Sequence, residues 1–331
     1  MRQGEPASVA RQLQDVPSGS LTVIRHTSSE RECVLLTHRF SAKTEGKGKL
    51  EVYPVFPGVD ASYNLLLAPE IAVHHSPSPN VLELFYCHSG RVGWDMRGGT
   101  AVYLGAGDLT AHSASCCADS AMVFPLGYAE GISISVDLAV LEAHCPEILR
   151  ESGLEFSALG EVFCAQKPVT LPACPELERI FAPLYSVPAS RRRAYLQLKA
   201  QELLLYLADI QPGRQISTEY ASQQTELVRE IHRQLTEHLE QRFTIEELSK
   251  QYLINTSTLK EVFKGVYGMP IASYMKEYRM GQAMKLLRET RIPISEIARR
   301  VGYETQGKFS TAFKDVTQML PTEYRRSYSP R

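Results

Sequence analysis

The sequence lacks the features that define several common functional classes. No apolar run approaches the roughly 20 residues that a membrane-spanning helix needs, and the first residues, MRQGEPASVARQLQD, include no apolar segment typical of a signal peptide. There is no Walker-type phosphate loop, no GxGxxG fingerprint and no GxSxG nucleophile elbow. We therefore expect a cytoplasmic protein that is not an enzyme and has no catalytic residues.

Cysteine is present without the spacing of a disulfide framework or a CxxC pair. The seven cysteines are an odd number, all precede residue 175, and none forms a CxxC pair. Disulfide frameworks and structural zinc sites require cysteines at set spacings. We expect free thiols in a reducing compartment, and we predict neither a metal nor a cofactor.

Charge is unevenly distributed along the 331 residues, although the net charge is only −1. From residue 226 to the end there are 18 Lys and Arg against 13 Asp and Glu, a balance of +5. The rest of the chain has 36 − 18 = 18 basic and 37 − 13 = 24 acidic residues, a balance of −6. The length predicts two domains, and the basic C-terminal part favours a polyanionic partner for that end.

The N-terminal part reads as strands followed by helices. After a polar segment at 1–30, which we expect to be flexible, short apolar runs are separated by Gly, Pro, Asn and Asp, as is typical of a barrel or sandwich. These runs lie at 34–36, 50–55, 63–67, 81–86, 101–104, 122–124 and 132–136. Helical spacing follows at 138–149, 175–184 and 194–210. The segment 31–210 is thus predicted to be one domain, and the polar segment 211–224 a linker.

The C-terminal part, 225–327, has helical periodicity throughout and contains the same pattern twice. Thr244 and the carboxylate three residues later form a capping box, and Asn255 is suited to cap the next helix. A second helix–turn–helix follows, with its turn at residues 301–303. The connector from 271 to about 289 would span very roughly 30 Å as a helix. That is close to the roughly 34 Å between successive major-groove faces of DNA.

This part resembles the AraC/XylS family of bacterial regulators over residues 226–326. The residues around Leu259 look most like the siderophore-regulator branch of that family. The residues that carry the resemblance are Leu248, Leu259, Phe263, Lys264, Gly268, Tyr274, Arg279, Ala283, Leu286, Leu287, 294–298, Val301, Gly302, Tyr303, Phe309, Ser310, Ala312, Phe313, Lys314 and 321–325. The sequence departs from the family pattern at Gln318, where Gly is usual, at Gly307 and Lys308, where Ser and an aromatic are usual, and at Gly281 inside the connector.

The resemblance implies a DNA-binding face on the second helix of each unit. In the first unit this face comprises Ser257, Thr258, Lys260, Glu261 and Lys264, and in the second Gln306, Gly307, Lys308, Thr311 and Lys314. Gln can bond adenine through two atoms, Lys can meet guanine or phosphate, and Thr can contact a thymine methyl or a phosphate. The alternative for such side chains is an ordinary solvated helix face. Phe263, Phe309 and Phe313 are predicted to be core residues.

The β-rich segment is loosely similar to the cupin-like ligand domains that often precede this DNA-binding module. An apolar and aromatic effector pocket could include Tyr86, Trp94, Tyr103 and Phe124, although core packing accounts for each of them equally well. Four histidines are available to a cupin metal site, His74, His75, His88 and His112, but no His-x-His pair with a matching Glu occurs. A metal site is therefore not predicted.

Taken together, the sequence predicts an α+β protein: an N-terminal cupin-like β-barrel followed by helices, and a C-terminal all-α domain of two helix-turn-helix units joined by a long helix. We expect a sequence-specific transcription regulator that binds a promoter operator in double-stranded DNA. Activation is the commoner outcome in the family that the sequence resembles, so we expect an activator. The expected partners are a small-molecule effector that could be siderophore-like, RNA polymerase and a second copy of the chain, but no membrane. The alternatives are a constitutive DNA-binding protein and a metal-dependent cupin enzyme with an attached DNA-binding module.

Overall fold

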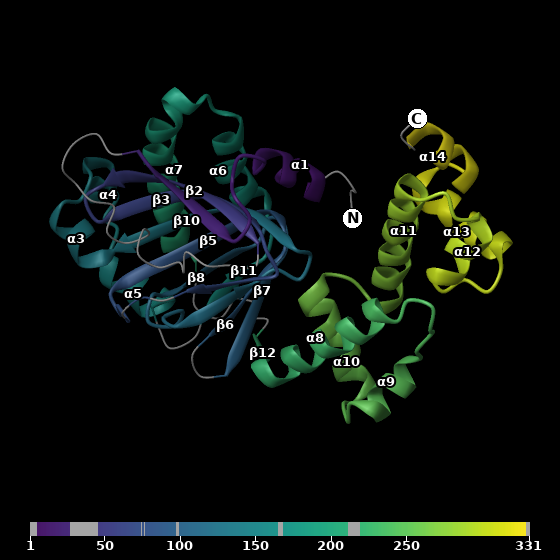
Figure 1. The fold of residues 1–331 in the computed structure, drawn as a ribbon. Helices are drawn as coiled ribbons and strands as arrows, with labels where there is room; N and C mark the ends of the chain where they lie inside the picture. Colours follow the sequence, from purple (N-terminus) through teal and green to yellow (C-terminus); the bar gives the residue numbers. More distant parts are fainter. Residues whose placement is uncertain are drawn as a thin grey trace. The chain divides into compact units, whose positions relative to one another are not determined.

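The computed structural model describes residues 5–26, 46–73, 75, 77–96, 99–164, 168–210 and 219–328. The chain divides into two compact units, an N-terminal unit that ends at Ser222 and a C-terminal unit that begins at Gln223 (Figure 1). The predicted strand at 34–36 and residues 211–218 of the predicted linker lie outside the described residues. No described helix is both long enough and apolar enough to cross a membrane.

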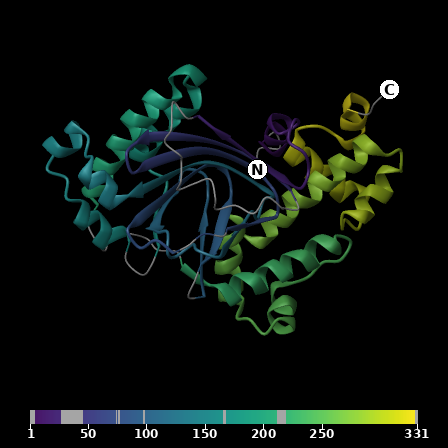
Figure 2. The ribbon, with the colours of Figure 1, turned by 60° about the vertical axis from the view of Figure 1, so that its left-hand side comes forward.

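The N-terminal unit contains two sheets. The first has the order β1-β2-β3-β10-β5-β8-β11 and the second the order β12-β7-β6-β9-β4. All pairs are antiparallel except β1 with β2. The strands are β1 (Ser20–Arg25), β2 (Lys47–Phe56), β3 (Val59–Leu67), β4 (Glu70–Val73), β5 (Val81–Gly90), β6 (Val92–Met96), β7 (Thr100–Leu104), β8 (Leu109–Ser113), β9 (Ser120–Val123), β10 (Tyr128–Asp137), β11 (Val169–Leu171) and β12 (Glu219–Ala221). Figure 2 shows the curvature of these strands.

The helices of this unit are α1 (Glu5–Gln12), α3 (Leu138–Ala143), α4 (Glu147–Glu151), α5 (Phe156–Phe163), α6 (Pro175–Ser186) and α7 (Arg192–Ala208), with a 3₁₀ turn at Ala189–Arg191. The helix predicted at 138–149 is two helices, because Pro146 lacks the amide hydrogen that a continuous helix would need there. A sheet-rich N-terminal unit with helices after the strands was predicted and is confirmed.

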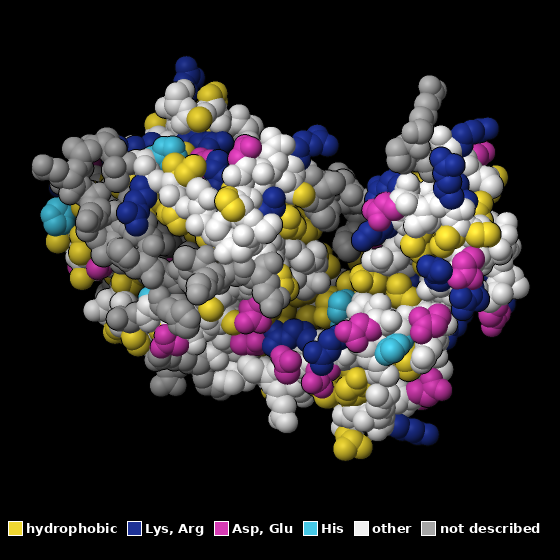
Figure 3. Space-filling view, in the orientation of Figure 1, with side chains coloured by type: hydrophobic (Ala, Val, Ile, Leu, Met, Phe, Trp, Pro, Cys, Tyr) yellow, Lys and Arg dark blue, Asp and Glu magenta, His cyan; other side chains and the backbone are white. Residues whose placement is uncertain are grey.

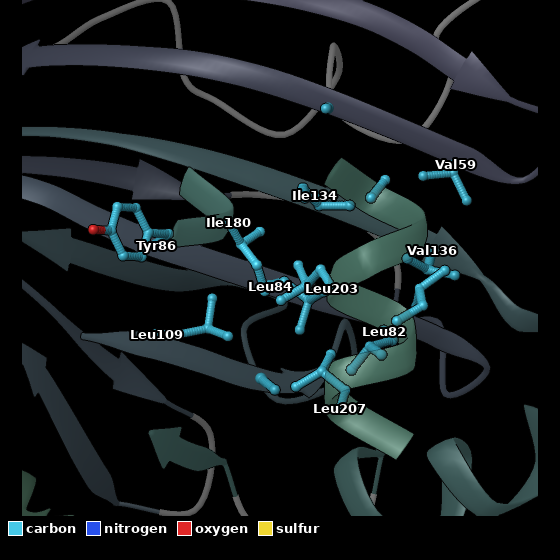
Figure 4. Packing of buried hydrophobic residues seen from close by; sticks show 14 of the residues in the cluster. Val59, Leu82, Leu84, Tyr86, Leu109, Ile134, Val136, Ile180, Leu203 and Leu207 are labelled. Carbon is cyan, nitrogen blue, oxygen red and sulfur yellow. The ribbon is translucent and has the colours of Figure 1, made fainter. Parts of the chain in front are cut away.

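Two hydrophobic clusters lie on opposite faces of the seven-stranded sheet. Because successive side chains of a strand point to opposite faces, Phe85 packs with Trp94 between the two sheets, whereas Tyr86 stacks on Phe181 of α6. Figure 4 shows the helix-covered cluster, in which Leu203 and Leu207 of α7 lie against strand residues such as Leu82 and Leu84.

The N-terminal end of the chain differs from its prediction. Residues 1–30 were expected to be flexible, yet α1 and β1 lie within this segment, and Val9 and Leu13 are buried against Tyr128. Apolar residues at positions 9, 13 and 16 are spaced as on one helical face, which is a weak signal within an otherwise polar segment. The end of the predicted linker also differs, because β12 pairs with β7 and α8 begins at Ser222.

The C-terminal unit is helical, as predicted. Its helices are α8 (Ser222–Glu237), α9 (Ile245–Gln251), α10 (Thr256–Tyr267), α11 (Ile271–Glu289), α12 (Ile294–Arg300), α13 (Gln306–Thr317) and α14 (Pro321–Tyr328). The long α11 contacts helices of both helix-turn-helix pairs, α10 in the first and α12 and α13 in the second. The predicted architecture of two such pairs joined by one long helix is confirmed.

Candidate nucleic-acid interface

The first helix-turn-helix pair consists of α9 and α10. The capping box predicted at the start of α9 is present: the Glu247 amide donates to Thr244 Oγ1 at 3.1 Å, and the Thr244 amide donates to Glu247 Oε2 at 2.7 Å. The bonds from Thr244 hold the pKa of the exposed Glu247 carboxyl below its usual value. These bonds satisfy amide hydrogens that the first turn of any helix leaves without partners.

The turn of this pair has an unusual backbone. Leu253 has φ of 52°, in the left-handed region that leucine rarely adopts, and its side chain is 93% exposed. Next to it, Ser249 Oγ donates to the Ile254 carbonyl at 2.5 Å. Asn255 then caps α10 by accepting from the Ser257 amide at 2.9 Å. The turn therefore fixes where α10 begins.

Helix α10 has one buried and one exposed face. The buried face consists of Leu259, Val262, Phe263, Val266 and Tyr267. On the other side Ser257, Lys260, Glu261 and Lys264 are exposed, and Thr258 is half-buried. The Ser257 hydroxyl is already hydrogen-bonded to Asn255 Oδ1 at 2.7 Å. Ser257 therefore acts as part of the cap, whereas the two lysines of this face lie in solvent.

The second pair consists of α12 and α13, joined by a turn at Gly302. Gly302 has φ of +78°, and a Cβ built there would lie 2.2 Å from the Leu239 carbonyl oxygen. Thr305 Oγ1 accepts from the Lys308 amide at 3.3 Å and so caps α13. Phe309 and Phe313 are fully buried, as predicted for core residues. Only glycine fits this turn without displacing the backbone of residue 239.

Helix α13 also has its predicted face in solvent. Gln306, Gly307, Lys308, Thr311 and Lys314 are all exposed. Two of them have partners close by in the chain: Lys308 Nζ bonds Glu304 Oε2 at 2.6 Å, and Thr311 Oγ1 donates to the Gly307 carbonyl at 3.2 Å. This bond uses one of the three donors of the Lys308 ammonium group. Acidic and basic side chains are interspersed across the visible surface of this unit (Figure 3).

Two arginines attach the segment between α8 and α9 to α11 and to the turn of the second helix-turn-helix pair. Arg279 of α11 donates to the Gln241 carbonyl at 2.8 Å, and Arg242 donates to the Gly302 carbonyl at 3.2 Å. The Arg242 guanidinium also lies over the Tyr303 ring, 5.7 Å from its centre. The segment after α8 is thereby attached to the turn of the second pair. Gly302 was recognisable in the sequence as a turn residue, but Arg242, which lies 60 positions earlier, could not be identified from the sequence as its partner.

A half-buried histidine supports the first pair. His232 of α8 stacks on Tyr267 with ring centres 4.4 Å apart, and its Nε2 is 2.8 Å from the Tyr274 hydroxyl. Burial lowers the pKa of His232 from 6.5 to about 4. The ring is therefore neutral at physiological pH and serves packing.

The four aromatic residues predicted to form an effector pocket are not brought together as a group. Trp94 and Phe124 share the cluster between the sheets, Tyr103 lies under Gly93, and Tyr86 points to the helix-covered face. Each is a buried core residue. Of the four histidines considered for metal binding, His74 lies outside the described residues. Among the residues that the structure describes, no group of three or more His, Cys, Asp or Glu could hold a metal ion.

Comparison with known proteins shows what the C-terminal unit is similar to. Residues 248–327 match the family described as a helix-turn-helix domain. The chain is 33% identical over 99 residues to the arabinose operon regulatory protein of Escherichia coli, a match that covers 30% of this chain and 34% of that protein. It is 32% identical over 94 residues to the transcriptional activator RhaR of Mannheimia succiniciproducens, covering 28% of this chain and 34% of the relative.

Among solved structures, the C-terminal domain of AraT, a response regulator from Geobacillus stearothermophilus, is 34% identical, covers 32% of this chain and 88% of its own, and has a TM-score of 0.31. The matches thus span about a third of the length of the curated relatives. The C-terminal unit is a helix-turn-helix domain. It is of the AraC type, which confirms the resemblance for this part of the chain. The siderophore-regulator branch and the cupin-like character of the N-terminal unit stay predictions.

Proposed function

We propose that this protein is a sequence-specific DNA-binding transcription regulator whose helices α10 and α13 enter successive major grooves. The observation that supports this most strongly is the repetition within one unit. Each recognition helix is capped at its start, buried on one face and polar on the other. The 19-residue helix α11 between the pairs has a length of about 28 Å, close to one turn of B-DNA.

The exposed side chains supply the chemistry that DNA recognition needs. Lys264 and Lys314 would neutralise phosphates or meet guanine, Gln306 would bond adenine, and Glu261 would accept from cytosine. Lys260, Thr258 and Thr311 would add phosphate or thymine contacts. A Cβ placed on Gly307 would have no atom within 4 Å, so the backbone of this residue can approach DNA closely. Lys308 would meet a phosphate through the ammonium donors that its bond to Glu304 leaves.

The charge of the C-terminal part favours the same partner. From residue 226 onward the balance of Lys and Arg over Asp and Glu is +5. Release of counterions from DNA by such side chains gives binding energy that does not depend on sequence. Ser257 has a smaller part in this proposal, because its hydroxyl belongs to the cap of α10.

We further propose that the N-terminal unit regulates DNA binding. In this proposal the unit binds a small-molecule effector and pairs with a second copy of the chain, and the bound dimer contacts RNA polymerase and activates transcription. The relatives named above are an operon regulator and a transcriptional activator. An effector can change DNA binding only if it favours one arrangement of the two units in free energy.

The first test measures DNA affinity as a function of salt. Operator fragments are selected from random duplexes with the full chain, and the slope of log affinity against log salt is measured by fluorescence anisotropy. Lys264→Ala and Lys314→Ala should each reduce the slope by about one unit if each lysine contacts a phosphate. Lys199→Ala, which removes one positive charge from the N-terminal unit, is the matched control and should leave the slope unchanged. Unchanged slopes for both lysine variants would remove them from the interface.

The second test concerns base readout. Gln306→Ala should change the preference at one base pair by about 1–3 kcal/mol while affecting other positions little. Selection from a library randomised at each operator position measures this. An equal loss of affinity across all sequences would contradict the role of Gln306 as a base-reading residue.

A further inference from the structure

A polar cavity of about 170 Å³ lies in the N-terminal unit, on the helix-covered face of the seven-stranded sheet. Its lining includes Lys49 and Glu51 of β2, Tyr63 of β3, Glu130 of β10, Tyr185 of α6 and Arg192 of α7. A cavity of about 150 Å³ accommodates benzene. The space here therefore suits a ligand of roughly six to ten non-hydrogen atoms, but its charged lining is unsuited to a hydrocarbon.

Tyr185 brings a hydroxyl group without a partner to this cavity. Its ring stacks on His88 with centres 3.7 Å apart and meets Tyr63 edge-on at 6.0 Å. The hydroxyl is buried and has no hydrogen-bond partner among the described residues. Burial raises the pKa of Tyr185 well above its usual value, so the hydroxyl keeps its proton. A buried donor of this kind is costly unless an acceptor is bound to it.

Arg192 provides a second such donor. Its Nη1 donates to Glu51 Oε2 at 2.6 Å, and its guanidinium lies 5.0 Å from the centre of the Tyr63 ring. Its Nε is buried and has no partner among the described residues. Lys49 also pairs with Glu51 at 2.7 Å. Two cations therefore share one carboxylate, which leaves one excess positive charge where both unpartnered donors are found and favours a bound anion.

Glu130 brings the opposite charge to the same cavity. It lies at the bulge between residues 130 and 131 of β10 and accepts from Ser89 Oγ at 3.3 Å. Among the described residues it forms no ion pair, unlike Glu51. A partly buried carboxylate without a counter-charge favours a cation, and an ammonium group fits its acceptor-only oxygens.

We propose that this cavity is a binding site for a small zwitterion, a free amino acid or a similar ammonium carboxylate. Its carboxylate would accept from Tyr185 Oη and Arg192 Nε, and its ammonium group would donate to Glu130. The proposal that a ligand binds here depends only on the cavity and its lining. The proposal that this ligand is the effector rests on the function proposed above. Such a ligand would connect strands of the sheet to α6 and α7.

The test begins with the wild-type full chain. Each of the standard amino acids is added separately at about 10 mM, a concentration that raises the melting temperature for a Kd up to about 1 mM. For each amino acid that binds, calorimetry compares it with its decarboxylated amine and its deaminated acid. The expected result is that at least one amino acid binds and that both analogues bind at least about tenfold more weakly. No shift with any amino acid, or equal binding of an analogue, would overturn the proposal.

Two conservative variants then locate the site. Tyr185→Phe removes only the hydroxyl and keeps the ring on His88, and Glu130→Gln removes the charge and keeps the shape. Each should weaken binding about tenfold, as expected for the loss of a hydrogen bond to a charged group. Tyr206→Phe is the matched control, because the Tyr206 hydroxyl contacts Cys174 Sγ at 3.5 Å and its residue does not line this cavity. Unchanged affinity in both test variants would place the ligand elsewhere.

DNA binding is measured on the same preparations. A protein that binds the zwitterion but no operator would contradict the proposed regulator and leave this site intact. A protein that binds its operator but no zwitterion would contradict the site alone. The two proposals therefore fail separately.

Discussion

The same substitution, glycine to alanine, should have opposite effects at two positions of the C-terminal unit. Gly302 forms the turn of the second helix-turn-helix pair, with φ of +78°. Gly281 lies inside helix α11, and a Cβ there would have no atom within 4 Å. Replacing Gly302 is expected to destabilise the unit, and replacing Gly281 to stabilise it.

The magnitudes follow from the local geometry. At Gly302 a left-handed backbone costs alanine about 1–2 kcal/mol. The new Cβ would also lie 2.2 Å from the Leu239 carbonyl oxygen, a backbone atom that cannot rotate away, and such overpacking costs about 1–3 kcal/mol. Gly302→Ala should therefore reduce the free energy of unfolding by about 2–5 kcal/mol. Gly281→Ala should increase it by about 0.5–1 kcal/mol, because alanine loses less backbone entropy in a helix.

Urea unfolding of the full chain can measure both effects with an internal control. The chain has one tryptophan, Trp94, which is buried in the N-terminal unit. Its fluorescence follows that unit alone, whereas far-ultraviolet circular dichroism follows the helices of both. The two variants should shift the dichroism transition in opposite directions and leave the fluorescence midpoint unchanged. A stable Gly302→Ala variant, or a shift of both signals together, would refute the reasoning.

Three further predictions concern the same unit. Phe313→Ala should lower the free energy of unfolding by about 3–5 kcal/mol, because the ring is fully buried; an equally stable variant that has lost only DNA binding would contradict its core position. Gln318 ends α13 with φ of 60°, so Gln318→Gly should raise the free energy of unfolding by about 1 kcal/mol in the same urea assay. No gain would show that the bond from the Gln318 side chain to the Asp315 carbonyl at 3.1 Å offsets the backbone strain. Burial lowers the pKa of His232 to about 4, so the unfolded state binds the proton more tightly than the folded state does. The free energy of unfolding should therefore fall as the pH drops from about 6.5 toward 4, by about 2 kcal/mol at pH 5. A His232→Gln variant with the same loss would exclude this residue as the cause.

Local signals in the sequence were sufficient for the C-terminal unit. The Thr244 capping box, the Asn255 cap and the apolar spacing of α10 and α13 each depend on residues within a few positions of one another. A helix is held together by bonds between neighbours four residues apart, so its start, its end and its buried face can be predicted from the chain. The exposed faces of α10 and α13 were expected from the resemblance to a known family, and the residues expected on them are exposed except Thr258, which is half-buried.

In the N-terminal unit, local signals did not predict how the strands pair or which face of each strand meets the helices. The strands were predicted from short apolar runs, but their pairing order was not, because strand partners can be far apart in the chain. Tyr86 and Trp94 were considered for one pocket, with core packing as an equal alternative. The alternation of β5 turns Tyr86 toward α6 and its neighbour Phe85 toward Trp94. Alternation predicts that two neighbours face opposite ways, but only the packed sheets decide which face meets helices.

The sequence by itself determined the doubled helix-turn-helix pattern and its caps, because these depend on local backbone bonding and helical periodicity. Only the tertiary structure decided which distant groups meet. It attached Arg242 to the Gly302 turn and brought Glu51, Glu130 and Arg192 to one cavity from β2, β10 and α7. No local rule specifies such contacts, because they arise when sheets and helices pack to bury their apolar faces and leave polar groups at the edges.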